Sequence, residues 1–206
     1  DTIDPTFHAT EVAGVLIGNG TINPNRTGIA PKAQIRADER DDGFDYNNTG
    51  GTLGIPYDYG YAINIENIDL ASNSWGYGIL SKLNSTNKAL LCQYYGDYEN
   101  NAELFDKIVH GDLSYLTLPV EPTTIVFSAG NERDGGTNPC TSTYNPDYPY
   151  KTINPPHTAK NIITVGSIDW WDNSISYFSA FGPTDDDRIK PELIAPGAGI
   201  STPSGN

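Results

Sequence analysis

Short runs of apolar and β-branched residues recur along this chain, and long segments separate them. The runs have the length and composition of buried strands, and some of the separating segments have helical character. Such long connections favour parallel pairing, because a parallel crossover needs a dozen or more residues, whereas a short turn can join antiparallel strands. We therefore expect an α/β fold with a mainly parallel sheet, with candidate strands at 33–37, 68–72, 124–128 and 162–166.

Two segments have the pattern of helices. Over Glu99–His110 the apolar residues share one face, and Glu103 and Lys107 have the i, i+4 spacing of a helical ion pair. A second helix is expected over His8–Ile17, with Gly18 as its natural terminator. His8 should therefore lie at the N-terminus of a helix.

Charge limits the partners of the chain. Its 206 residues suit one domain, and 26 acidic against 12 basic residues give a net charge of −14. This charge repels phosphate backbones and anionic membrane surfaces, so we expect neither nucleic acid nor membrane as a partner. We expect no required cofactor and assign no metal ligand, although the acid-rich loops leave room for a structural calcium ion.

The chain contains two cysteines, Cys92 and Cys140. They can form one disulfide outside the cytosol or remain as two free thiols within it, and both states fit their spacing. We expect the disulfide.

His8 opens the segment HATEVAG. An imidazole has an ordinary pKa near 6.5, so it can take a proton from a serine hydroxyl and return it to a leaving amine near neutral pH. The alternative is a helix-start histidine whose hydrogen bonds are satisfied by its neighbours.

Asn131 ends the segment FSAGN, which follows an apolar run. Its amide could donate a hydrogen bond to the oxyanion that develops during acyl transfer. The alternative is a strand followed by an ordinary Gly-Asn turn.

These segments resemble motifs of the subtilases, a family of serine proteases. HATEVAG is similar to HGTHVAG, with Ala9 and Glu11 as departures, and FSAGN is similar to the AAGN or SAGN segment. Further matches follow in family order at 28–33, 73–76, 158–166, 178–183 and 188–197. The resemblance implies a three-layer α/β/α fold with a mostly parallel sheet of about seven strands. Residues 1–206 would be one partial catalytic domain, with insert-like loops at about 77–122 and 135–156.

The resemblance also implies a substrate site and catalytic roles. His8 would be the general base and acid, and Asn131 would lie in the oxyanion hole. An extended peptide would bind by strand addition between two walls of main chain, formed by Ser74, Trp75 and Gly76 on one side and by Ser128, Ala129 and Gly130 on the other. The alternative for Trp75 is a plain core residue.

The orienting aspartate and the nucleophilic serine of the family have no match. Asp1 and Asp4 leave no room for the strand and loop that precede the histidine, and Ser201 and Ser204 lack the GTS context. We therefore expect the chain alone to be inactive, with a missing segment or a second chain supplying both residues.

The leading hypothesis is a subtilisin-like serine endopeptidase, secreted or at the cell surface, that hydrolyses extended polypeptides through an acyl-enzyme. One alternative is a non-catalytic peptide-binding module with the same fold. Another is a structural or stalk domain, which predicts no chemistry at His8 or Asn131.

Overall fold

The computed structural model describes residues 8–37, 54–76, 92–113, 120–133 and 147–201. The chain forms two compact units. One consists of Asp1–Arg40 with Gly199–Asn206, and the other of Asp41–Ala198.

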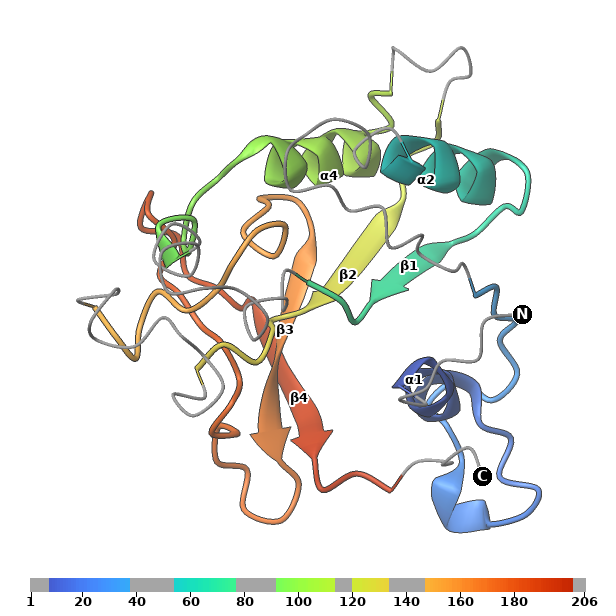
Figure 1. Cartoon of the computed structure of the whole chain (residues 1–206). Coiled ribbons are helices and arrows are strands. Elements are labelled where there is room, and N and C mark those ends of the chain that lie inside the picture. The colour runs from blue at the N-terminus through green and yellow to red at the C-terminus, as the bar shows by residue number, and fades with distance from the viewer. Residues whose placement is uncertain (1–7, 38–53, 77–91, 114–119, 134–146, 202–206) are drawn as a thin grey trace. The chain divides into compact units, whose positions relative to one another are not determined.

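A parallel sheet is the centre of the second unit (Figure 1). Its described strands lie in the order of the sequence, each paired with the next: β1 (Leu70–Asn73), β2 (Thr124–Ser128), β3 (Ile163–Asp169) and β4 (Leu193–Ala198). The α/β class and the mainly parallel sheet are thus confirmed. The expected strands at 68–72, 124–128 and 162–166 correspond to β1, β2 and β3. Of the expected seven or so strands, the described part of this unit contains four.

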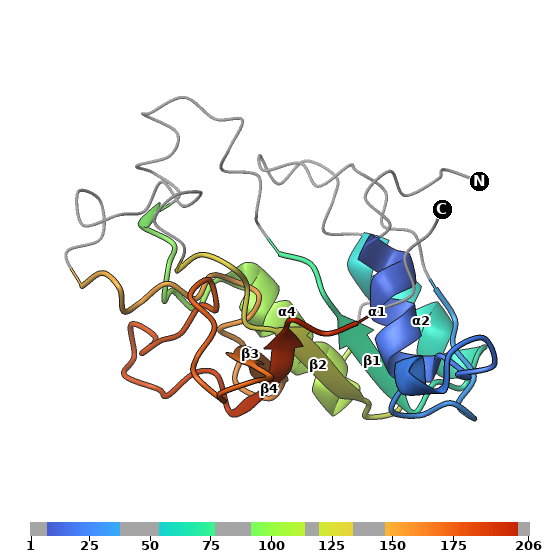
Figure 2. The ribbon, with the colours of Figure 1, turned by 90° about the horizontal axis from the view of Figure 1, so that it is seen from below.

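Helices α2 (Gly54–Asn64) and α4 (Asn100–His110) form one layer against this sheet. Figure 2 looks at the sheet from below, with α4 behind the strands. As expected, α4 buries one apolar face and carries a Glu103–Lys107 ion pair of 2.7 Å. Glu99 caps its N-terminus, and Gly111, at φ 72°, caps its C-terminus. The sequence analysis missed α2 because the helix begins in a glycine-rich stretch and contains Pro56 and Gly60.

Aromatic rings join these helices to the sheet. Phe105 of α4 and Phe127 of β2 are fully buried, with ring centroids 4.9 Å apart. Trp75 contacts Phe127 edge-on at 5.1 Å, and Tyr59 of α2 contacts Phe105 at 5.6 Å. Edge-to-face pairs of this kind contribute about 0.5–1.5 kcal/mol each beyond the burial of area. The core therefore ends directly beneath residues 74–76.

The first unit contains α1 (His8–Ile17), with the expected bounds, and the short 3-10 helix η1 (Pro24–Arg26). The chain folds back along α1, where the amide of Ile29 donates to the carbonyl of Val15. The strand expected at 33–37 is not formed. These residues begin in a turn and are all exposed. The described part of this unit contains no strand with which they could form backbone hydrogen bonds. An apolar run without a pairing partner leaves its backbone groups to water.

None of the described helices is both long enough and apolar enough to cross a membrane. Cys92 is buried and disulfide-bonded, and the described residues include no free cysteine. Cys140, with much of the two expected insert-like loops, lies outside the described residues.

Candidate functional site

The two predicted substrate walls leave the sheet at the same edge. Strands β1 and β2 are parallel, and the last residue of β1, Asn73, is paired with Phe127. Ser74–Gly76 and Ser128–Gly130 therefore follow a matched pair of residues at the carboxyl ends of adjacent strands. In open α/β sheets this is the edge at which ligands bind.

Asn73 fixes the start of the first wall. Its side chain is buried, and its amide donates to the carbonyl of Val126 at 3.2 Å. Its side-chain oxygen accepts hydrogen bonds from the Tyr59 hydroxyl at 2.9 Å and from the Trp75 indole at 3.0 Å. The side chain of Trp75 thus packs with the core, as the plain alternative held. Any contact of Trp75 with a peptide would be made by its main chain.

His157 lies beside this wall and was not singled out from the sequence. Its Nε2 is 3.0 Å from the carbonyl oxygen of Trp75, and its ring centroid is 5.4 Å from that of Phe127. A carbonyl oxygen can only accept, so Nε2 carries the proton. Complete burial lowers the pKa of the imidazole to about 4, so the ring is neutral at neutral pH. Its signal in the sequence was a lone histidine in the otherwise uncharged stretch 152–159, directly before a strand.

The second wall is held from the other side. The amide of Ala129 donates to the carbonyl of Val165 in β3 at 2.8 Å, and the carbonyl of Gly130 accepts from Ala180 at 3.1 Å. Gly130 has φ 92°, a conformation that L side chains rarely adopt. Asn131 follows in an exposed turn.

Glu132, directly after Asn131, is 9% exposed. Burial raises the pKa of this carboxyl to about 7, and backbone hydrogen bonds at Glu132 and Asn131 oppose the shift. The sequence signal for Glu132 is an acidic residue directly after the predicted oxyanion donor Asn131. It was not among the predicted site residues.

Arg133 attaches this turn to the segment after β3. Its guanidinium donates to the carbonyls of Ser176, Tyr177 at 3.2 Å and Ile175 at 3.3 Å. Its own carbonyl accepts from the Tyr148 hydroxyl at 2.8 Å. The main chain around Asn131 is therefore restrained on both sides.

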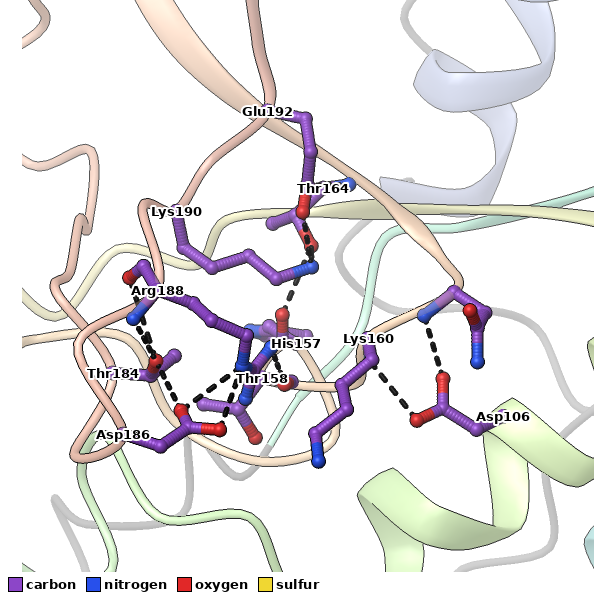
Figure 3. Close-up of polar contacts among 11 residues, drawn as sticks. Asp106, His157, Thr158, Lys160, Thr164, Thr184, Asp186, Arg188, Lys190 and Glu192 are labelled. Atoms are coloured by element: carbon purple, nitrogen blue, oxygen red, sulfur yellow. Dashed lines mark hydrogen bonds and ion pairs between the residues drawn. The ribbon is translucent and has the colours of Figure 1, made fainter.

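A series of buried polar contacts supports the main chain of His157 (Figure 3). The Lys190 side chain is 1% exposed, and its ammonium is 2.6 Å from a Glu192 carboxylate oxygen. The ammonium also donates to the Thr164 hydroxyl at 3.1 Å, which in turn donates to the His157 carbonyl at 2.9 Å. Burial lowers the pKa of Lys190, and the Glu192 carboxylate opposes this shift. These contacts link the segment directly before β4 to His157, the residue that bonds the carbonyl of Trp75.

A second set of contacts in Figure 3 ties the loop before β3 to helix α4. The Asp106 carboxylate accepts from the amides of Asn161 at 2.7 Å and Lys160 at 3.0 Å. These contacts fix the chain just after His157. Among the described residues, no group of three or more His, Cys, Asp or Glu side chains is placed to hold a metal ion.

The two predicted catalytic residues belong to different units. His8 is the first residue of α1 in the first unit, as the sequence predicts, and it is exposed. Asn131 belongs to the second unit, together with both predicted walls. Ser201 is exposed in the first unit, whereas Asp1, Asp4 and Ser204 lie outside the described residues.

Comparisons with known proteins identify the family of the chain. The profile of the Subtilase family matches residues 4–205. The chain is also similar to Bacillopeptidase F of Bacillus subtilis (strain 168), with 28% identity over 203 residues. That match covers 96% of this chain but only 12% of the relative, so the chain spans about an eighth of the relative's length. Because the family match extends over almost all of its residues, the chain belongs to the subtilase family.

Proposed function

We propose that this chain is part of a serine endopeptidase that hydrolyses peptide bonds in extended polypeptides through an acyl-enzyme. The observation that carries the proposal is the register of β1 and β2. It brings Ser74–Gly76 and Ser128–Gly130 to one edge of the sheet, where they can receive a peptide as an added strand. Main-chain hydrogen bonds would supply affinity, and pockets between the walls would supply preference.

Asn131 is proposed as the oxyanion donor. Stabilising the tetrahedral intermediate requires a donor that is already in place when charge develops on the substrate oxygen. The contacts of Ala129, Gly130 and Arg133 restrain the main chain on both sides of Asn131, while its side chain is exposed to a ligand. This combination of a fixed backbone and an accessible amide supports the role.

His8 is proposed as the general base and acid. It would take the proton of a serine hydroxyl during attack and return it to the leaving amine. Its place at the first residue of α1 presents the imidazole at the exposed end of a helix. We assign neither the nucleophilic serine nor the orienting aspartate to this chain. A further segment of the polypeptide or a second chain would supply them, and the 206 residues alone would not hydrolyse peptides.

We further propose that the protein acts outside the cell, in solution or at the surface. The disulfide at Cys92 supports this, because disulfides persist in oxidising compartments and are rare in the cytosol. The structural calcium ion expected from the acid-rich loops stays a prediction.

A fluorophosphonate probe tests the proposed function in the full-length protein that carries this sequence. We expect the probe to label one serine, and His8→Ala to abolish both labelling and peptide hydrolysis. His110→Ala is the matched control, because His110 is also an exposed histidine at a helix end, the C-terminus of α4. This substitution should leave labelling and hydrolysis unchanged. Hydrolysis that persists in the His8→Ala protein would refute the assignment.

The second candidate is a subtilase-like module that binds peptides without cutting them. It is favoured by one observation, namely that both walls lie in the second unit, whereas His8 lies in the first. This candidate predicts that the full-length protein binds an extended peptide in calorimetry, resists the probe, and binds equally well as the His8→Ala variant.

A further inference from the structure

His157 lies between the two segments to which we assign substrate binding. Its Nε2 donates to the carbonyl of Trp75 in the first wall, and its ring packs against Phe127, the residue that leads into the second. The backbone of Ala129 also interacts with the ring, and like the Trp75 carbonyl it favours the protonated form. Within the described residues, no hydrogen bond of standard geometry reaches Nδ1. The ring thus contacts both walls, and its hydrogen bond of standard geometry goes to the first.

Gly76 and the imidazole fit directly against each other. A Cβ atom added to Gly76 would lie 2.6 Å from Cε1 and 2.9 Å from Nε2 of His157. Contacts this short do not occur for real side chains, so the ring occupies the space that a side chain at position 76 would need. The main chain of Gly76 can approach the imidazole this closely only because the residue has no side chain.

The hydrogen bond also sets the direction of the neighbouring amide. In a trans peptide the C=O and the following N–H point in opposite directions. Because the Trp75 carbonyl points at Nε2 of His157, the N–H of Gly76 points away from the ring. This is the orientation that a donor needs in order to bond a carbonyl of a strand laid along the first wall.

His157 is itself held in place by buried contacts. Its amide donates to the carbonyl of Asn154 at 2.9 Å, and its carbonyl accepts from Thr164, which the Lys190–Glu192 pair supports (Figure 3). A side chain that is 1% exposed and fixed through its main chain can transmit this rigidity to the residue it bonds.

We propose that His157 is a positioning residue for substrate binding, whose Nε2–H···O=C bond to Trp75 fixes the peptide plane between Trp75 and Gly76. The proposal rests on the proposed function of the two walls. It assigns His157 to the binding of extended peptide and not to the chemical step. If His157 had a purely structural role, its substitution would affect folding and would not weaken the binding of extended peptides selectively.

Three substitutions in the full-length protein separate these readings. His157→Gln keeps an N–H near the position of Nε2, whereas His157→Met keeps the length and removes the donor. Ile153→Val is the matched control, because Ile153 is fully buried in the same stretch and the described contacts of its main chain are with Gly96. All kinetic values are divided by the concentration of protein that a fluorophosphonate titrates, so that unfolded protein does not enter.

The substrates are a hexapeptide amide and an N-acetyl ester of a single amino acid. For His157→Met we expect KM for the hexapeptide to rise about tenfold, the effect of one lost hydrogen bond, with kcat nearly unchanged. The ester should be cleaved as by the unaltered protein, because it does not extend along the first wall. His157→Gln should restore most of the KM, and Ile153→Val should change neither substrate.

Equal losses on both substrates, or a His157→Gln protein no better than His157→Met, would overturn the proposal. Should His157→Met fail to fold, His157→Asn takes its place, because its shorter amide does not reach the Trp75 carbonyl. Calorimetric binding of the hexapeptide separates the failure of this proposal from that of the proposed function. A protein that binds without cutting refutes the endopeptidase, and the ratio of Kd values between His157→Gln and His157→Met still decides the role of His157. A protein that neither binds nor cuts refutes both.

Discussion

The substitution Glu132→Gln should change how the stability of the protein depends on pH. Burial raises the pKa of Glu132 to about 7 in the folded state, from an ordinary value of 4.5. Between these two values the folded state binds more protons than the unfolded state, so the free energy of unfolding falls as pH rises. At 1.36 kcal/mol per pKa unit, the loss between pH 4.5 and pH 7 is about 3 kcal/mol.

His157 acts in the opposite direction over nearly the same range. Burial lowers its pKa to about 4, from an ordinary value of 6.5. Between these values the unfolded state binds more protons, so the stability contributed by the neutral ring is present above pH 6.5 and is lost as pH falls through 4. The magnitude is again about 3 kcal/mol. In the unaltered protein the two contributions largely cancel between pH 4.5 and 6.5.

Single substitutions should therefore reveal each contribution alone. We expect the difference in unfolding free energy, Glu132→Gln minus the unaltered protein, to rise by about 3 kcal/mol between pH 4.5 and 7. For His157→Gln the difference should rise by a similar amount as pH falls from 6.5 to 4. Taking differences removes the contribution of the other carboxylates, which all the proteins share. Urea unfolding at constant ionic strength, followed by circular dichroism, measures these values.

A flat difference curve for Glu132→Gln would refute the reasoning, because it would mean that Glu132 is ionised in the folded protein at pH 5. The conservative variant Glu132→Asp provides the control. Its carboxyl still titrates, so its difference curve should slope less than that of Glu132→Gln.

Three further predictions follow from the packing and the proposed site. Asn131→Ala should lower kcat of the full-length enzyme by about 10²- to 10³-fold with little change in KM, a magnitude carried over from subtilisin, and Asn161→Ala, outside the site, should not. Phe105→Ala should cost about 3–5 kcal/mol in urea unfolding, because it removes the ring that joins Tyr59, Trp75 and Phe127, and an exposed Tyr57→Ala should cost far less. Lys190→Met should destabilise the fold by about 1–3 kcal/mol, since the Glu192 carboxylate loses its partner, and Lys190→Met with Glu192→Gln should recover part of that loss in a double-mutant cycle.

Elements with a strong local signal were predictable from the sequence. Helix α4 has an apolar face, an ion pair at i, i+4 and a glycine terminator, and its bounds differ from the expected ones by a single residue. Strand β2 has the expected bounds because its buried run ends at a turn-forming Gly-Asn pair. The run at 33–37 has equal local character, but the described residues of its unit include no neighbouring strand with which it could pair. A strand forms only when a partner strand is available, and the sequence of the strand alone does not predict that partner.

The same difference between local and long-range signals applies to the residues of the candidate site. His8 and Asn131 stand out because each opens or closes a local motif, a helix start in one case and a turn after a strand in the other. His157 and Asp106 carry no such motif. They act on residues that are 82 and 55 positions away, at the carbonyl of Trp75 and the amide of Asn161. Periodicity and spacing within a window of about 18 residues do not detect contacts of that range.

This difference has a physical cause that applies to the whole sheet edge. The walls of the proposed site are main chain, and main chain has the same hydrogen-bonding groups at every residue. What makes Ser74–Gly76 distinct is its surroundings: the Asn73 amide beneath it, the register with β2, and the imidazole against Gly76. Each of these is supplied by a different part of the chain. A substitution at His157 should thus alter peptide binding without changing any residue of the wall itself, which a reading of the motif alone would not predict.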